Sequence, residues 1–176
     1  MRYLITGGAG FIGSHLADSI AEDMHHITLL DNVSTGTVQN VQHLLDADQA
    51  RLEFGSILDE SLVRRLVREA DVVVHLAASV GVKLIIERPL ETLMNNIRGT
   101  EIVLEACADA GAKVLVASTS EIYGKNADGP LHEESDRILG TPFKARWSYS
   151  TGKAVDETKS VPIRAESTGA SRRTAE

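Results

Sequence analysis

The sequence predicts an α/β protein in which a doubly wound parallel sheet is covered by helices on both faces. Short apolar runs alternate with stretches of helical periodicity along most of the chain. A glycine-rich turn separates the first apolar run from the first helical stretch. Apolar strands that are separated by helices are typical of a parallel sheet buried on both faces.

Five apolar runs are the predicted strands of this sheet. They are residues 3–5, 27–30, 52–54, 71–75 and 114–116. Between the first two, Ile12, Leu16 and Ile20 recur every four residues, which predicts a helix with one buried stripe. Residues 38–45 predict a second helix.

Two further helices are marked by their caps. Asp59 is a predicted N-cap for a helix over residues 60–67. The longest helix has Pro89 in its first turn and Gly111 just past its end. Its apolar residues predict an inner stripe of Leu90, Leu93, Ile97, Leu104 and Cys107.

The chain is predicted to change character near residue 157. Residues 125–148 form a long segment of the kind that often carries function. We expect one dinucleotide-binding domain over residues 1–157, and a disordered tail over residues 158–176 that resembles a frame-shifted or truncated reading.

Composition excludes several classes of protein. The 176 residues carry 18 Lys and Arg against 25 Asp and Glu, a net charge of −7 that argues against nucleic-acid or anionic-membrane partners. A single cysteine excludes an intrachain disulfide, and no metal site is expected. No apolar run has membrane-spanning length, and the chain begins directly in a strand, so we expect a cytoplasmic protein.

The strongest local motif is the turn between the first strand and the first helix. Gly7, Gly10 and Gly13 follow a Gly-x-x-Gly-x-x-Gly spacing that allows backbone N–H groups to approach a pyrophosphate. Asp31 closes the second strand, where a carboxylate accepts hydrogen bonds from both ribose hydroxyls and repels a 2′-phosphate. The sequence therefore predicts that NAD binds, in preference to NADP.

Tyr149 is the predicted general base, and Lys153 is predicted to stabilise its phenolate form. Residues four apart share one helix face. A nearby ammonium and the positive nicotinamide ring both stabilise a phenolate and lower its pKa. Tyr149 is therefore predicted to take a proton from a sugar hydroxyl as hydride leaves the same carbon. Thr119, which follows the fifth strand, is predicted to hydrogen-bond the reacting oxygen, and Glu121 to act as a second acid or base.

These motifs resemble the extended short-chain dehydrogenase/reductases of the NAD-dependent epimerase/dehydratase type. The resemblance implies a Rossmann sheet that lacks its last strands and the C-terminal substrate domain, NAD as cofactor, and a nucleotide sugar (a UDP- or GDP-sugar) as substrate. It implies a catalytic set of Thr119, Ser120, Glu121, Tyr149 and Lys153. The implied cofactor residues are Gly7, Gly10, Phe11, Ile12, Gly13, Asp31, Asn32, Ser34, Gly36, Ser56, Ile57, Leu76, Ala77, Ala78, Asn95, Tyr149 and Lys153.

Glu121 favours one subclass of this family. Thr119-Ser120-Glu121 is similar to the strand end of 4,6-dehydratases and UDP-glucuronate decarboxylases, which form a 4-keto intermediate. A UDP-sugar 4-epimerase, a truncated inactive NAD-binding fragment and an NAD-sensing scaffold are the alternatives. Ser56 departs from the aspartate that many members carry against the adenine. The resemblance also implies a homodimer through residues 89–110 and 149–157.

Overall fold

The structure is a computed structural model that describes residues 1–79, 87–127, 129–141, 143–144 and 146–167. Its sheet has the strand order β3-β2-β1-β4-β5, and every neighbouring pair is parallel. The strands are β1 Arg2–Thr6, β2 His26–Asp31, β3 Ala50–Phe54, β4 Val72–His75 and β5 Lys113–Val116. The predicted parallel α/β class and its five strands are confirmed.

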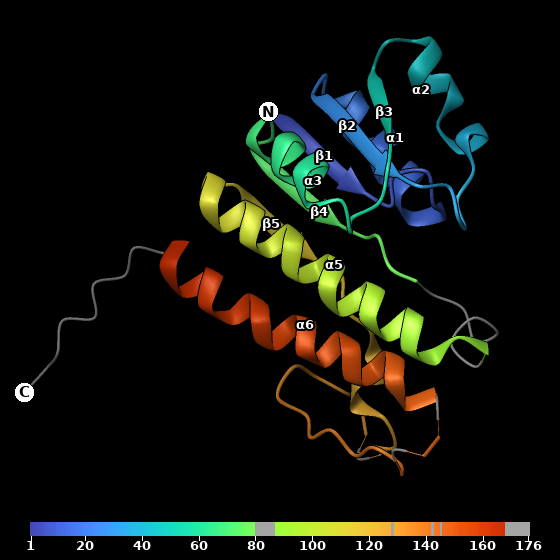
Figure 1. Ribbon diagram of the computed structural model, residues 1–176, viewed down its shortest axis with the longest axis vertical. Coiled ribbons are helices and arrows are strands. Elements are labelled where there is room, and N and C mark those ends of the chain that lie inside the picture. Colours follow the sequence, from blue (N-terminus) through green and yellow to red (C-terminus); the bar gives the residue numbers. More distant parts are fainter. Residues whose placement is uncertain (80–86, 128, 142, 145, 168–176) are drawn as a thin grey trace, which may run out of the picture.

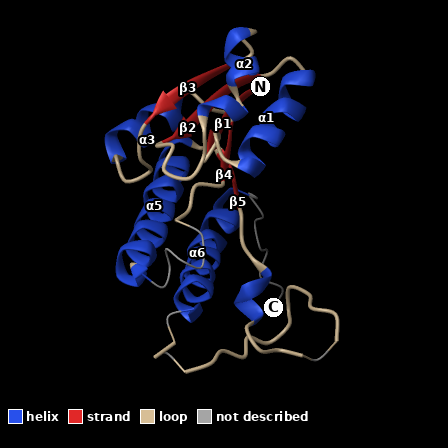
Figure 2. Ribbon diagram, turned by 90° about the vertical axis from the view of Figure 1, so that its right-hand side faces the viewer, coloured by secondary structure: helices blue, strands red, loops and turns tan. Residues whose placement is uncertain are grey.

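Helices cover both faces of this sheet (Figures 1 and 2). The helices are α1 Phe11–Glu22, α2 Gln42–Asp46, α3 Glu60–Arg68, α5 Pro89–Ala110 and α6 Arg146–Ser167, with 3₁₀ turns η1 Val38–Asn40 and η2 Ser120–Tyr123. One buried cluster joins α1 and α2 to the sheet, and a second joins α3 and α5 to the opposite face. Among the residues that the structure describes, no helix combines the length and the apolarity that a membrane crossing needs.

The buried face of α1 differs from the predicted stripe. Its buried residues are small, and they are Gly13, Ser14, Ala17 and Ala21. Ile12 is 66 % exposed, whereas Leu16 and Ile20 are half-buried. Small side chains allow the helix to approach the sheet closely, which keeps the N-terminus of α1 against the glycine-rich turn.

The inner stripe of α5 is confirmed except at its start. Leu104 and Cys107 are buried, but Leu90 is 71 % exposed because the first turn of α5 extends past the sheet (Figure 1). Leu93 and Ile97 lie against α6, beside Gly152. Gly111 ends the helix in the left-handed conformation, with φ of 67°.

Helix α6 continues beyond the predicted domain boundary at residue 157. Its last residue is Ser167, so the helix includes the first ten residues of the predicted tail. The Lys159 ammonium pairs with Glu101 of α5 at 3.2 Å, and the Thr158 hydroxyl donates to the Ala154 carbonyl at 2.9 Å. Residues 168–176 lie outside the described residues, and the division of the chain at residue 157 stays a prediction.

Candidate functional site

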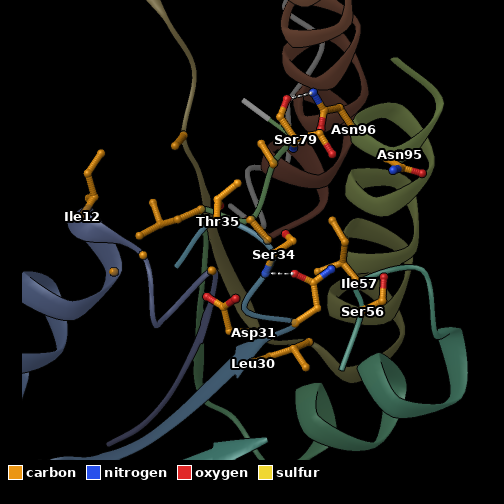
Figure 3. A pocket seen from close by; sticks show the side chains of 18 of the residues that line it. Ile12, Leu30, Asp31, Ser34, Thr35, Ser56, Ile57, Ser79, Asn95 and Asn96 are labelled. Carbon is orange, nitrogen blue, oxygen red and sulfur yellow. Dashed lines mark hydrogen bonds between the residues drawn. The ribbon is translucent and has the colours of Figure 1, made fainter. Parts of the chain in front are cut away.

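A cavity of about 460 Å³ opens where the strands end at their carboxyl termini (Figure 3). Parallel α/β sheets bind ligands at this edge. Most of the residues predicted to hold a cofactor line it, and these are Gly7, Gly10, Phe11, Ile12, Gly13, Asp31, Asn32, Ser34, Ser56, Ile57, Leu76, Ala77, Ala78, Asn95, Tyr149 and Lys153. The fold therefore brings together segments that are far apart in the sequence.

Gly36 is the one predicted cofactor residue that does not line the cavity. A Cβ atom on it would lie 2.6 Å from the Ala9 carbonyl oxygen. The adjacent Thr37 N–H donates to the same oxygen at 3.1 Å. Gly36 thus packs behind the glycine-rich turn and acts on the cavity only through that turn.

Several lining residues lie outside the predicted cofactor and catalytic sets. They are Leu30, Thr35, Gly55, Leu58, Ser79, Asn96, Ala117 and Ser118. Half of them, Leu30, Gly55, Ala117 and Ser118, lie within two residues of the last residue of a strand, so a predicted strand terminus was the available signal for these four. Asn96 fixes the backbone of Ser79 from α5, because it accepts from Ser79 N at 2.6 Å and donates to Ser79 O at 3.1 Å (Figure 3).

The glycine-rich turn brings backbone N–H groups to the cavity wall. Gly7 has φ of 72°, a conformation that favours glycine. A Cβ atom on Gly13 would lie 2.3 Å from the Gly7 carbonyl oxygen, which no side chain tolerates. The N-terminus of α1 therefore faces the cavity at close range, as an anion-binding turn requires.

Asp31 is held at the end of β2 by two backbone donors. Ala9 N–H donates to Oδ2 at 2.9 Å, and Val33 N–H donates to Oδ1 at 2.8 Å. A carboxylate has about four acceptor sites, so each oxygen keeps a lone pair for a further donor. The side chain is 8 % exposed, and its remaining acceptors serve the cavity.

Ser56 and Asn32 line the part of the cavity beyond Asp31. Ser56 Oγ accepts the Leu58 N–H at 3.1 Å, which leaves its hydroxyl proton free to donate. Asn32 accepts the Ser34 N–H at 3.1 Å and closes the turn that follows β2 (Figure 3). This wall offers a planar ligand a hydroxyl group and the apolar side chain of Ile57.

Tyr149 and Lys153 reach the same cavity from α6, one turn apart. Lys153 is 4 % exposed, and its ammonium donates to the Ala117 carbonyl at 3.1 Å, directly after β5. A second partner is Asp156, whose Oδ2 lies 3.5 Å from Lys153 Nζ. The ammonium is therefore bound between the end of β5 and its own helix.

In the chain alone the pKa of Tyr149 is raised, whereas the predicted lowering relies on both Lys153 and the positive nicotinamide ring of bound NAD. Burial raises the pKa of the phenol above its ordinary value of 10.0, and the carboxylates of Glu121 and Asp156 raise it further. The predicted lowering depends on a nearby positive charge, and the Lys153 ammonium is directed at Ala117 and Asp156 instead.

The predicted cluster Thr119-Ser120-Glu121 lies beside the cavity without lining it. These residues follow β5 and enter η2, where the Thr119 hydroxyl accepts the Glu121 N–H at 3.3 Å. Glu121 is exposed, and its negative charge raises the pKa of the Tyr149 phenol. Ser118, which does line the cavity, donates its hydroxyl to Glu157 of α6. The Tyr149 phenol, the Lys153 ammonium and the Ser118 hydroxyl therefore line the cavity, and the Thr119 hydroxyl and the Glu121 carboxylate lie beside it.

Comparison with known proteins points to one family of sequences. The family model described as GDP-mannose 4,6 dehydratase matches residues 4–169. A UDP-N-acetyl-alpha-D-glucosaminuronate decarboxylase from Bacillus cytotoxicus is 43% identical over 157 residues, which are 89% of this chain and 48% of that protein. UDP-glucuronic acid decarboxylase 1 from Xenopus tropicalis is 38% identical over 159 residues, 89% of this chain and 36% of that protein. The chain thus spans half or less of these relatives.

Solved structures agree with this fold. The UDP-glucose 4-epimerase of Thermotoga maritima, solved with UDP-glucose, has a TM-score of 0.82 at 29% identity and matches 96% of this chain and 52% of its own. The Thermus thermophilus UDP-glucose 4-epimerase, solved with NAD, has a TM-score of 0.79 at 32% identity and matches 96% of this chain and 52% of its own.

Proposed function

We propose that this chain, which belongs to the NAD-dependent epimerase/dehydratase family of the GDP-mannose 4,6-dehydratase type, is the NAD-binding half of a nucleotide-sugar decarboxylase. The observation that carries the proposal is the meeting of Tyr149, Lys153 and the strand end at Thr119–Glu121 beside the cavity. The decarboxylase names of the relatives that are 43% and 38% identical support a UDP-uronic acid as substrate.

The residues of the cavity fit NAD. The glycine-rich turn and the N-terminus of α1 would hold the pyrophosphate, because their N–H groups and the helix dipole favour negative charge. The free lone pairs of Asp31 would accept the hydroxyls of the adenosine ribose, and a 2′-phosphate would be repelled by the same carboxylate. Ser56 and Ile57 would contact the adenine. When bound, NAD supplies the acceptor for a hydride.

The residues of this chain would then act on the sugar. Tyr149 removes the proton of the C4 hydroxyl as hydride leaves C4, and Lys153 opposes the negative charge that develops on the phenol. Oxidation at C4 converts a uronic acid into a β-keto acid, in which the bond between C5 and the carboxyl carbon breaks and CO₂ leaves. Ser120 and Glu121 position the resulting enolate and return a proton to C5. Hydride then returns to C4 and Tyr149 gives its proton back to the C4 oxygen, so that the product is a UDP-pentose.

A UDP-sugar 4-epimerase is the second candidate. It is favoured by the solved epimerases that match 96% of this chain. Glu121 separates the two candidates, because an epimerase returns hydride to C4 and needs no further carboxylate at C5. A homodimer through residues 89–110 and 149–157 stays a prediction. Helices α5 and α6 lie side by side along these ranges (Figure 1).

The experiment that tests the proposal has two stages. The chain is first titrated with NAD and with NADP, and we expect NAD to bind more tightly; equal affinities, or no binding, would overturn the cofactor assignment. The protein that contains this chain together with a substrate domain is then incubated with UDP-glucuronate or with UDP-N-acetylglucosaminuronate. Release of CO₂ and a UDP-pentose product supports the decarboxylase, whereas a C4 epimer without CO₂ supports the epimerase.

Variants identify the roles. We expect Tyr149→Phe to abolish hydride transfer while NAD remains bound. Glu121→Gln is expected to leave oxidation at C4 intact and to slow the later proton transfer. If Glu121→Gln slowed oxidation alone, the assignment of Glu121 to proton transfer at C5 would be wrong.

A further inference from the structure

A chain of buried polar groups runs beneath the cavity, between the glycine-rich turn and α6. Thr6 of β1, His75 of β4 and Thr100 of α5 are each at most 1 % exposed. Thr6 Oγ1 lies 2.7 Å from His75 Nδ1, and His75 Nε2 lies 3.1 Å from Thr100 Oγ1. Thr6 Oγ1 also accepts the N–H of Ala77, a residue of the cavity wall, at 3.2 Å.

The direction of these hydrogen bonds follows from the charge of His75. Burial and the nearby Lys153 ammonium lower the pKa of His75 to about 3, so the ring is neutral and has one donor and one acceptor nitrogen. Thr6 already accepts from Ala77, and its own proton is available for Nδ1. In the tautomer in which Nδ1 accepts from Thr6, His75 Nε2–H donates to Thr100. The Thr100 hydroxyl keeps one proton to give to another acceptor.

The Asp156 carboxylate lies near Thr100, at the end of this chain. The side chain is 1 % exposed, and neither carboxylate oxygen accepts a hydrogen bond of ordinary geometry from the described residues. Burial raises the pKa of the Asp156 carboxyl, while the Lys153 ammonium and the Thr100 hydroxyl oppose that rise. A buried carboxylate with so few partners is costly unless an opposite charge accompanies it. Lys153 Nζ, at 3.5 Å, supplies that charge.

We infer that Asp156 is a positioning residue that fixes the Lys153 ammonium at the cavity wall. Asp156 holds the ammonium from within α6, and the Ala117 carbonyl holds it from the end of β5. An ammonium has three N–H groups, so one remains to be directed into the cavity. The Thr6–His75–Thr100 chain, which holds the backbone of the cavity wall at Ala77, ends near the same carboxylate.

This inference rests on the proposed function, because Lys153 must contact bound NAD for its position to affect binding. The test is a double-mutant cycle on NAD affinity with Asp156→Asn, Lys153→Met and the double variant. Asp156→Asn keeps the side-chain volume and removes the charge. We expect it to weaken NAD binding about tenfold, the size of one charge-assisted hydrogen bond. In the Lys153→Met background the same substitution should change NAD affinity less than about twofold.

The matched control is Glu101→Gln. It removes the carboxylate partner of Lys159, another lysine of α6, outside the cavity. Its NAD affinity should equal that of the unsubstituted chain. A purely structural role for Asp156 predicts the opposite pattern, in which Asp156→Asn weakens NAD binding equally whether or not Lys153 is present. That result would overturn the inference and leave the proposed function intact.

A stability measurement keeps the test decisive if a variant binds no NAD. Lys153→Met leaves Asp156 as a buried charge without its partner, and we expect a lower midpoint of thermal unfolding. Adding Asp156→Asn to Lys153→Met should raise the midpoint again, although Asp156→Asn alone lowers it. Equal lowering in both backgrounds would overturn the pairing. If the unsubstituted chain itself bound no NAD, the proposed function would fail, and this inference with it.

Discussion

At the scale of single residues, His75 links stability to pH. The ordinary pKa of 6.5 falls to about 3 in the folded protein, because the ring is buried and lies near Lys153. The unfolded chain takes up a proton below pH 6.5 that the folded chain does not. This contribution to stability is therefore complete above pH 6.5 and is lost as the pH falls toward 3.

A His75→Gln variant tests this link. Glutamine can donate and accept a hydrogen bond but does not titrate. From about pH 7 to about pH 5 we expect the unsubstituted chain to lose about 2 kcal/mol more of its free energy of unfolding than the variant does. Urea denaturation of both proteins at the two pH values measures the difference. Equal losses of unfolding free energy in the two proteins would show that titration of His75 does not cause the loss of stability at acid pH.

A second residue-scale prediction concerns Gly13. A Cβ atom there would lie 2.3 Å from the Gly7 oxygen and 2.8 Å from Gly8 Cα, and both are backbone atoms. Gly13→Ala should therefore cost about 1–3 kcal/mol of stability and abolish NAD binding. Gly111→Ala is the control, because its φ of 67° imposes strain, while an added Cβ would meet no non-neighbouring atom of the described residues within 4 Å. That variant should lose about 1 kcal/mol and keep its NAD affinity; comparable NAD affinity in both variants would contradict the role of the turn.

At the scale of helices and strands, the sequence predicted where elements lie better than which face they bury. Ile12 and Leu90 fit a helical apolar stripe, yet both are exposed. The buried face of α1 depends on how closely it approaches the sheet, and that of α5 depends on α6. Both are tertiary properties. The extension of α6 past residue 157 also depends on tertiary contacts, because the Lys159–Glu101 ion pair joins this part of the helix to α5.

The N-cap of α3 is a local feature that the sequence did predict. The Asp59 carboxylate accepts the Leu62 N–H at 3.0 Å and the Ser61 hydroxyl at 2.8 Å, and these hydrogen bonds lower the pKa of Asp59. Asp59→Ala should cost about 1 kcal/mol of stability in chemical denaturation. Asp59→Asn keeps the cap acceptor and should cost much less. Similar losses in the two variants would assign the effect to charge instead of to capping.

At the scale of the whole molecule, the topology explains how much of the site could be predicted. Parallel strands bring their carboxyl ends to one edge, so Gly7, Asp31 and the segment that follows β5 could be expected to meet. The role proposed for Asp156 could not be predicted, because its position in the sequence is that of an ordinary polar residue on an exposed helix surface. Only the packing of α6 against α5 and β5 buries that carboxylate beside Lys153.

The same strand order leaves one edge of the sheet, β5, without a second neighbouring strand among the described residues. β5 ends the strand order, and within the described residues only β4 pairs with it. Val114 packs into the cluster beneath α3 and α5. Successive side chains alternate between the two faces of a sheet, so Leu115 points to the other face, where it is 57 % exposed. An apolar residue on an unpaired edge strand is a site of association.

We therefore expect this chain on its own to self-associate through the edge at Leu115. Leu115→Lys should weaken the association about tenfold, because burying one leucine contributes about 1.5–3 kcal/mol. Sedimentation velocity over a range of concentrations measures the effect. Met24→Lys adds the same charge at a side chain that is 91 % exposed and precedes β2, which β1 and β4 separate from β5. It should leave the association nearly unchanged. If both lysine variants dissociated equally, net charge would explain the result, and the β5 edge would have no special part in it.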